Sequence, residues 1–502
     1  MSNAPTPPDP SAAERPPALR NWLSLAGGVT VAASLFAFVF LVAIDTVTRE
    51  PSPYVGILTY LIAPAFLILG LLLILTGWLV QRKRIARSQN LPAGRRALTI
   101  DLSRPRDRRW LTYFAGGAAA FLLLTAFGSY QTYHFTESVA FCGETCHTVM
   151  QPEFTTYQHG AHARVACAEC HIGSGASWYV KSKISGAYQV YATAFNKYER
   201  PIKTPIRNLR PAQETCEHCH WPDKFSGNLD RSYVHYLSDK KNTPFTVRLS
   251  LRVGGGQPAN GFFGGIHWHM NVANRIEYYA SDPQRQVIPW VRMTSTGTGE
   301  VRVFRTKDFQ GEPPPGGIRV MDCMDCHNRP AHAYRSPNQA VETAMALGQI
   351  STNLPYVKKT AVEALTRPYK TTDEAFEGIA TVLRKKYQAA PEVAPAIAAV
   401  QLAYQEDFFP LMKADWQTYP NNIGHKDWPG CFRCHDDNHR TADGSVAVRS
   451  SDCTACHTLL AQGKGEELSR ITPQGAEFQH PGGDLEPGAL CSDCHNGSIQ
   501  GK

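Results

Sequence analysis

The chain has 502 residues, with 51 lysines and arginines against 43 aspartates and glutamates, which gives a formal net charge of +8. Residues 81–109 alone contain ten basic and two acidic side chains, so this one segment has a net charge of +8. The positive charge is thus concentrated between apolar stretches, where it reports membrane topology and gives no indication of a nucleic-acid partner.

Three long apolar stretches lie near the N-terminus, at residues 21–47, 54–80 and 110–133. Each is long enough to cross a hydrocarbon core of about 30 Å as a helix that rises about 1.5 Å per residue. The first is too long for a signal-peptide core and lacks a clear small-residue cleavage site. We therefore expect residues 21–133 to form a three-helix transmembrane anchor that contacts the lipid bilayer.

The basic segment fixes the expected orientation of this anchor. Residues 81–109 lie between the second and third apolar stretches, and loops rich in lysine and arginine stay on the cytoplasmic side. Residues 1–20 then form a cytoplasmic N-terminal tail, and everything after residue 133 lies outside. The expected location is the bacterial inner membrane, with the C-terminal part in the periplasm.

All fourteen cysteines fall into closely spaced pairs, each followed at once by a histidine. Two cysteines three residues apart can bind both vinyl groups of one haem, and the next histidine can bind its iron. Zinc ribbons and disulfide frameworks need no histidine after every pair. The regular motifs are Cys167/Cys170/His171, Cys216/Cys219/His220, Cys323/Cys326/His327, Cys431/Cys434/His435, Cys453/Cys456/His457 and Cys491/Cys494/His495.

A seventh motif, Cys142/Cys146/His147, has three residues between its cysteines. A decayed motif or a lone disulfide is the alternative for this pair, but it stands first in the series and no other cysteine is left over. We expect seven c-type haems. The fold class expected is a membrane-anchored multihaem cytochrome c whose exported domain is haem-packed, mainly α-helical and irregular, with a small β-rich insert.

Two long gaps separate the motifs into groups. Residues 222–320 contain short alternating runs such as TVRLSLRV and EVRVFR between turns rich in glycine and proline, which predicts the β-rich insert. Residues 336–415 contain amphipathic patterns such as EAFEGIATVLRKKY, which predict a helical insert. Four haem motifs then belong to residues 134–335 and three to residues 416–502.

Each iron needs a sixth ligand or an open site, and eleven histidines lie outside the motifs. His267 and His269 alternate along an apparent strand, so we expect only one of them to face an iron. Met150 follows His147 by three residues, and a thioether ligand raises a haem potential relative to two imidazoles. Whether His147 or Met150 binds the first iron stays open. The other expected ligands are His162, His235, His267, His332, His425, His439 and His480.

A membrane helix that leads into CGETCHTVM, followed by GAHARVACAECHIG, ETCEHCH and CMDCHNRPAH, resembles the NapC/NirT family of membrane-anchored quinol dehydrogenases. The resemblance covers about residues 133–335 without the β-rich insert. It implies that Met150 ligates the first haem and that His162 and His332 are distal ligands. With seven motifs and three membrane segments, the whole chain looks more like inner-membrane heptahaem cytochromes of extracellular or anaerobic respiration.

The same resemblance indicates a quinol site. In the family, a lysine and an acidic residue lie beside the quinol on the helix after the second haem, here SWYVKSKISGAYQVYATAF. Lys181 and Lys183 are present, but the acidic position is taken by Tyr188 or Gln189. The alternative is an amphipathic helix that rests on the bilayer surface.

The function expected from these features is that of a quinol:cytochrome c oxidoreductase. It would oxidise menaquinol or another quinol of the membrane pool and reduce periplasmic c-type cytochromes or reductases. Two alternatives stay open: a terminal reductase of the nitrite or hydroxylamine type, and a non-catalytic electron-transfer subunit of a larger complex. The surplus of histidines argues against the open iron site that a terminal reductase needs.

Overall fold

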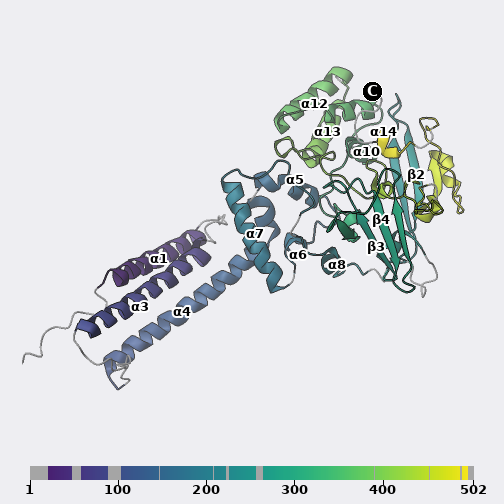
Figure 1. Ribbon diagram of the computed structural model, residues 1–502. Coiled ribbons are helices and arrows are strands. Elements are labelled where there is room, and N and C mark those ends of the chain that lie inside the picture. Colours follow the sequence, from purple (N-terminus) through teal and green to yellow (C-terminus); the bar gives the residue numbers. More distant parts are fainter. Residues whose placement is uncertain are drawn as a thin grey trace, which may run out of the picture. The chain divides into compact units, whose positions relative to one another are not determined.

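The computed structural model describes residues 21–47, 58–88, 103–145, 147–173, 175–206, 209–221, 225–255, 264–388, 390–450, 453–484, 486 and 489–495. The chain divides into two compact units, Met1–Thr145 and Cys146–Lys502. Figure 1 shows their elements, coloured from purple at the N-terminus to yellow at the C-terminus.

The first unit consists of long helices. They are α1 (Trp22–Val47), α3 (Ala63–Ser88) and α4 (Pro105–Thr136), with π-helical turns at Leu58–Ile62 and Phe141–Thr145. The first two are long and apolar enough to cross a membrane, over Trp22–Ala43 and Ala63–Arg84. Helix α4 has 32 residues and exposes Leu123 and Phe127, but its role as a third span remains a prediction.

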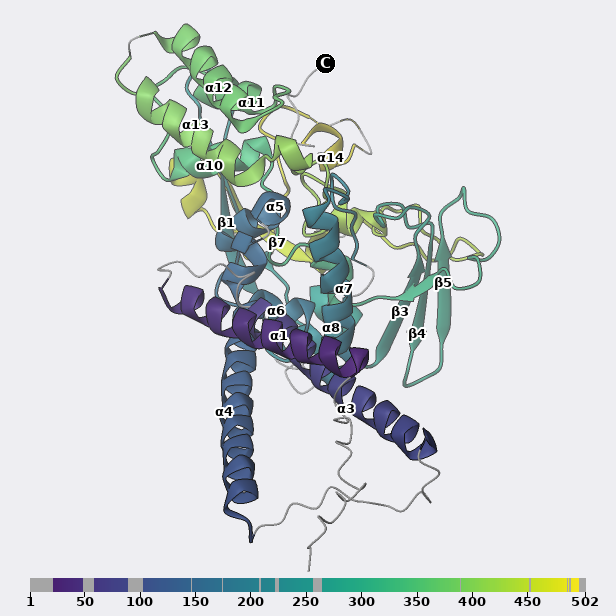
Figure 2. The same cartoon turned by 90° about the vertical axis from the view of Figure 1, so that its left-hand side faces the viewer.

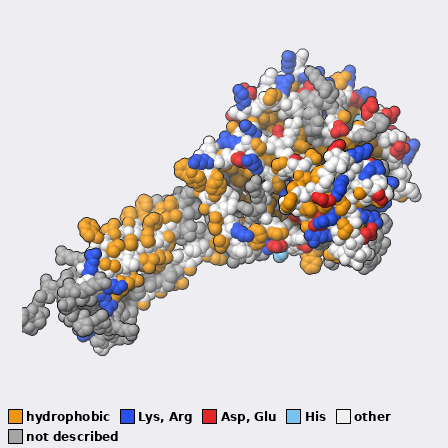
Figure 3. Space-filling model, viewed as in Figure 1, with side chains coloured by type: hydrophobic (Ala, Val, Ile, Leu, Met, Phe, Trp, Pro, Cys, Tyr) orange, Lys and Arg blue, Asp and Glu red, His pale blue; other side chains and the backbone are white. Residues whose placement is uncertain are grey.

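Helices α1 and α3 pack closely through small and polar residues. A Cβ added to Gly27 would lie 2.6 Å from the carbonyl oxygen of Gly70. Ser34 Oγ donates a hydrogen bond to the Ala63 carbonyl at 2.9 Å. Such contacts hold helices together in lipid, where burial of apolar surface gives no advantage. Large apolar side chains cover the outer surface of the pair, as expected of a bilayer anchor (Figure 3).

The second unit contains two antiparallel sheets. One has the order β1-β2-β7, with β1 at Leu229–Tyr236, β2 at Pro244–Leu251 and β7 at His457–Gly463. The other has the order β5-β4-β3-β6, and its first three strands lie side by side in Figure 2. Its strands are β3 (Asn274–Tyr279), β4 (Trp290–Ser295), β5 (Val301–Arg305) and β6 (Ile318–Val320).

All these strands except β7 fall within residues 222–320. Strand β7 was not expected, because it begins at His457, the last residue of a cysteine motif. It pairs His457 with Leu251 of β2. The β-rich segment is therefore joined to the C-terminal motifs. With two sheets besides its helices and irregular segments, the second unit is a mixed α/β domain, and its strands extend beyond the β-rich insert expected from sequence.

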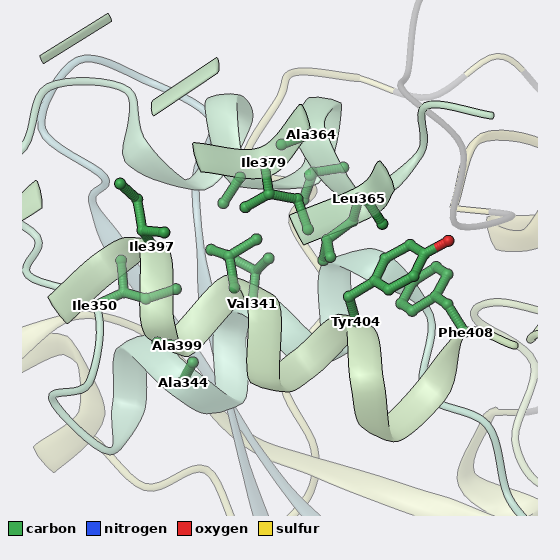
Figure 4. Close-up of a cluster of buried hydrophobic side chains, with 14 of the residues drawn as sticks. Val341, Ala344, Ile350, Ala364, Leu365, Ile379, Ile397, Ala399, Tyr404 and Phe408 are labelled. Carbon is green, nitrogen blue, oxygen red and sulfur yellow. The ribbon is translucent and has the colours of Figure 1, made fainter. Parts of the chain in front are cut away.

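Four helices occupy residues 336–415 and form an apolar core (Figure 4). They are α10 (Pro337–Ala346), α11 (Val357–Leu365), α12 (Thr372–Tyr387) and α13 (Val393–Asp407). Val341, Leu365 and Ile379 are almost fully buried between them. Local signals agree with packing in α12, where Thr371 caps the first turn and Arg384, Lys385 and Lys386 face the negative end of the helix dipole.

Short helices carry most of the cysteine motifs. They are α6 (Cys167–His171), α8 (Ala212–Cys216), α9 (Cys323–Cys326), η8 (Gly430–Arg433), η9 (Cys453–Ala455) and α14 (Cys491–Cys494). The second unit also contains the α-helices α5 (His147–Gln158) and α7 (Ala176–Ala194) and the 3-10 helices η6 (Ile266–Met270), η7 (Pro410–Met412) and η10 (Gly465–Ser469).

Candidate haem centres

Several cysteine motifs share one local geometry, a single helical turn that continues into the histidine. In α9, the Asp322 side chain accepts a hydrogen bond from the Met324 backbone N–H at 2.8 Å and so starts the turn. The backbone N–H of His327 then donates to the Cys323 carbonyl at 2.8 Å. The same bond forms in the motifs of His220, His435 and His495. It fixes these histidines relative to the two cysteines before them.

The third, fifth and sixth motifs depart from this geometry at their second cysteines; in the fifth, η8 ends at Arg433, one residue before Cys434. Helix α8 ends at Cys216, so Cys219 lies in the turn after it, and its backbone N–H donates to the Cys216 carbonyl at 3.1 Å. In the sixth motif, η9 ends at Ala455, and Cys456 lies between η9 and β7. The carbonyl of Cys456 accepts a hydrogen bond from the Arg252 backbone N–H at 2.8 Å. Haem attachment by Cys219 and by Cys456 was expected from spacing alone, and it remains a prediction.

The cysteines of the motifs differ in exposure. Five are exposed, namely Cys170, Cys219, Cys326, Cys431 and Cys494. Seven are half-buried, namely Cys142, Cys167, Cys216, Cys323, Cys434, Cys456 and Cys491. Cys146 and the side chain of Cys453 lie outside the described residues. Attachment of haem to each of these cysteines stays a prediction, and the histidines give the stronger geometric support.

Each histidine of the six regular motifs has a second histidine ring facing it. An iron with an imidazole on both faces separates the ring centres by roughly 6 Å, because each metal–nitrogen bond is about 2 Å long. The observed separations of ring centres are His162–His220 6.0 Å, His171–His332 6.3 Å, His267–His327 6.2 Å, His269–His435 5.8 Å, His425–His457 6.2 Å and His480–His495 6.0 Å.

Backbone carbonyls orient the rings of four histidines outside the motifs. The Nδ1 atom of His162 lies 3.0 Å from the Pro330 oxygen, and that of His332 lies 2.8 Å from the Glu153 oxygen. His267 and His269 make the corresponding bonds at 2.6 and 2.9 Å. A ring that donates its Nδ1 proton to a carbonyl keeps the lone pair of Nε2 for a metal. The donor set therefore fits haem iron.

Burial favours the neutral form, which binds iron, in four of the paired histidine rings. It lowers the pKa of His332 to about 4, and it also lowers the pKa of His269, His425 and His435. Desolvation disfavours the charged imidazolium, and metal ligation requires the neutral ring. Burial therefore favours the neutral form of all four imidazoles.

Neighbouring motifs are in direct contact. The side chains of Cys216 and Cys323, from the third and fourth motifs, lie close enough that each shifts the pKa of the other. Arg433 stands between the two cysteines of the fifth motif, and Asp325 stands between those of the fourth motif. Arg433 Nη2 donates a hydrogen bond to the Asp325 carbonyl at 2.7 Å. His425, which faces the sixth motif, stands shortly before the fifth in sequence. The third to sixth motifs therefore form a contiguous series.

Among the motif histidines whose side chains the structure describes, none has its ring against that of His235 or His439. The Nδ1 atom of His235 lies 2.9 Å from Glu342 Oε2. His439 is buried, with Nδ1 2.8 Å from Asp436 Oδ1 and Nε2 2.6 Å from the Ile288 oxygen. Both ring nitrogens of His439 are thus engaged by protein groups, which a spacing argument from sequence does not show.

His269 was not among the expected ligands, but its ring faces that of His435 of the fifth motif. The expected strand at His267 and His269 is wrong, because residues Ile266–Met270 form a 3-10 turn. At about three residues per turn, positions two apart point in widely different directions. The two rings can therefore meet the histidines of two different motifs.

The first motif is described only in part. Cys146 and the side chain of His147 lie outside the described residues, and Met150 is half-buried in α5. The ligation of the first iron by His147 or Met150 remains a prediction.

Helix α7 contains the residues of the expected quinol site, but they do not converge. Lys181 Nζ lies 4.4 Å from the ring centre of Trp178, and Lys183 Nζ lies 4.9 Å from that of Tyr179. Tyr188 follows Lys181 by seven residues, two turns along one face, and is 65% exposed. Gln189 donates a hydrogen bond to Ser185 Oγ at 3.5 Å.

The same helix exposes an apolar stripe. Its large exposed residues recur at helical spacing, which places them on one face: Val180, Ile184, Tyr188, Tyr191 and Phe195. A helix with such a face and flanking lysines suits the boundary between lipid and water.

Comparison with known proteins places these features in a family. Residues 106–225 match the N-terminal region of the NapC/NirT cytochrome c family. Over 495 residues, the chain is 41% identical to the cytochrome c-type protein ImcH of Geobacter sulfurreducens, with 95% of each chain covered. It is 33% identical over 101 residues to the cytochrome c-type protein NrfH of Wolinella succinogenes, which covers 19% of this chain and 55% of NrfH.

No solved structure gives a significant match. The relationship to ImcH extends through both units and confirms the resemblance seen in the motifs. The chain belongs to the NapC/NirT cytochrome c family.

Proposed function

We propose that this chain is a membrane-bound heptahaem cytochrome c that oxidises menaquinol and passes the electrons to periplasmic cytochromes or reductases. The six facing pairs of imidazoles carry the proposal. An iron held between two histidines has no open position for a substrate, so these centres suit electron transfer and disfavour a terminal reductase.

In this proposal the cysteines tether each porphyrin and the motif histidines bind from one side. His162, His267, His269, His332, His425 and His480 bind from the other side. Bound haem supplies reversible one-electron chemistry. The chain sets the spacing of the centres, and contacts such as Arg433 with Asp325 keep neighbouring motifs close enough for electron exchange.

Quinol is expected to meet the chain at α7 and the first motif. The apolar stripe of α7 would contact acyl chains, at the depth where quinol head groups lie. Lys181 and Tyr188, on one face, can hydrogen-bond the quinol hydroxyls. Met150 would favour electron acceptance, because a thioether ligand raises the potential of its iron.

The orientation proposed has the N-terminus in the cytoplasm, α4 as a third span and the motifs in the periplasm. The basic residues at the end of α3, at the start of α4 and between these two helices support it through the positive-inside rule. Covalent haem attachment on the outer side of the inner membrane is consistent with this orientation.

A variant of the quinol site tests the proposal. In lipid nanodiscs with menaquinol and a soluble cytochrome c as acceptor, Lys181→Ala/Lys183→Ala should lower the rate at least tenfold at limiting quinol. Lys203→Ala is the matched control, because Lys203 pairs with Glu199 on the surface. Equal rates in the wild type, the double variant and the control would show that quinol does not bind at α7. An inactive wild type would favour the alternative that the chain is a non-catalytic electron-transfer subunit.

A further inference from the structure

Arg329 presents a guanidinium group that is held in place but lacks an acidic partner. Its Cζ atom lies 3.9 Å above the ring centre of Tyr419 and 5.8 Å from that of Tyr334. The side chain as a whole is half-buried, and its Nη2 atom has no contact with solvent and no hydrogen-bond partner. Stacking on an aromatic ring fixes the plane of the guanidinium and leaves its N–H edge available.

The protein does not neutralise this cation at close range. Among the described residues, no carboxylate forms an ion pair with Arg329 within 4.0 Å. Glu153 lies near Arg329 but forms no ion pair with it. Glu153 Oε1 instead accepts a hydrogen bond from the Tyr334 hydroxyl at 3.2 Å. Because arginine stays protonated and a buried unpaired charge is costly, the site calls for an anion.

The surroundings identify the anion. Arg329 stands three residues before His332 in sequence, and the ring of His332 faces that of His171 of the second motif. Porphyrins of c-type haems carry two propionate carboxylates, and a guanidinium matches a carboxylate with two parallel hydrogen bonds. We propose that Arg329 binds a propionate of the haem held between His171 and His332. The inference rests on haem attachment at the second motif and does not depend on quinol as the donor.

The proposal predicts a specific redox effect. A positive charge at the propionate favours the reduced iron, so Arg329→Gln should lower the reduction equilibrium constant of one haem at least tenfold, about 59 mV for one electron. Arg329→Lys keeps the charge without the planar pair of donors and should give a smaller shift. Potentials of the individual haems are measured by spectroelectrochemistry, after mass spectrometry has shown an unchanged haem content.

A double-mutant cycle separates propionate binding from a pairing with Glu153. If Arg329 acted through a pairing with Glu153, the shift caused by Arg329→Gln would change in size in the Glu153→Gln background, whereas the same shift in both backgrounds supports the proposal. Arg335→Gln is the matched control, because Arg335 already pairs with Asp407 and should not single out one haem. An unchanged set of potentials in Arg329→Gln, or loss of its shift in the Glu153→Gln background, would overturn the proposal.

Discussion

Replacement of His269 by alanine tests the ligand assignment where the structure departs from the expectation from sequence. The ring centre of His269 lies 5.8 Å from that of His435, and its Nδ1 lies 2.9 Å from the Ile266 oxygen. Without this imidazole, the iron of the fifth motif keeps a single histidine ligand. One haem in seven should therefore change from low-spin to high-spin in the ferric protein.

His439→Ala is the contrasting variant. This side chain is buried and links Asp436 to the Ile288 carbonyl. Its loss leaves the Ile288 carbonyl without this donor, at about 1–3 kcal/mol, whereas Asp436 Oδ1 keeps the hydrogen bonds from the backbone N–H groups of Asn438 and of residue 439. The free energy of unfolding should fall by about 1–3 kcal/mol, while every haem stays low-spin.

Electron paramagnetic resonance of the purified ferric proteins measures the high-spin fraction against total haem, and thermal unfolding measures stability. The reasoning would be refuted if His269→Ala stayed entirely low-spin or if His439→Ala produced the high-spin signal.

Two further predictions concern the anchor and a buried ion-pair cluster. Gly27→Leu should separate α1 from α3 and lower the stability in detergent by about 1–3 kcal/mol, because its Cβ would lie 2.6 Å from the Gly70 oxygen. Gly28→Leu is the control, since nothing lies within 4 Å of its Cβ, and equal melting temperatures would contradict this packing. Burial alone would raise the pKa of Glu342, but the hydrogen bond from His235 and the charge of Lys358 hold it at about 2, below its usual 4.5. This carboxylate should stabilise the fold by about 3 kcal/mol above pH 4.5 and lose that contribution as the pH falls towards 2. Urea unfolding of Glu342→Gln should show a flatter pH dependence, and an unchanged slope would contradict the assignment.

The motifs could be predicted from sequence because their chemistry is local. Cysteine spacing, the next histidine and the apolar lengths of α1 and α3 depend on neighbours along the chain. The helical segment at residues 336–415 was predictable for the same reason, since its apolar residues recur at helical spacing.

The facing histidines depend on contacts between distant segments, which sequence spacing does not contain. His162 faces His220 and His332 faces His171 across long stretches of chain. The sequence suggested a strand at His267 and His269, but these residues lie in a 3-10 turn, so His269 was not expected as a ligand. The ring of His439 is instead held by hydrogen bonds to Asp436 and to the Ile288 carbonyl. Strand β7 was missed because the strand it pairs with among the described residues, β2, is far away in sequence.

Anaerobic stopped-flow mixing of the detergent-purified protein with menaquinol tests the central claim most directly. The absorption bands of the haems report their reduction, and Met150→Ala is measured in parallel. We predict fast reduction of the wild type that the substitution slows, because a ligand near the first motif would set the potential at which electrons enter. No reduction of the wild type on the timescale of turnover would contradict quinol oxidation by this chain.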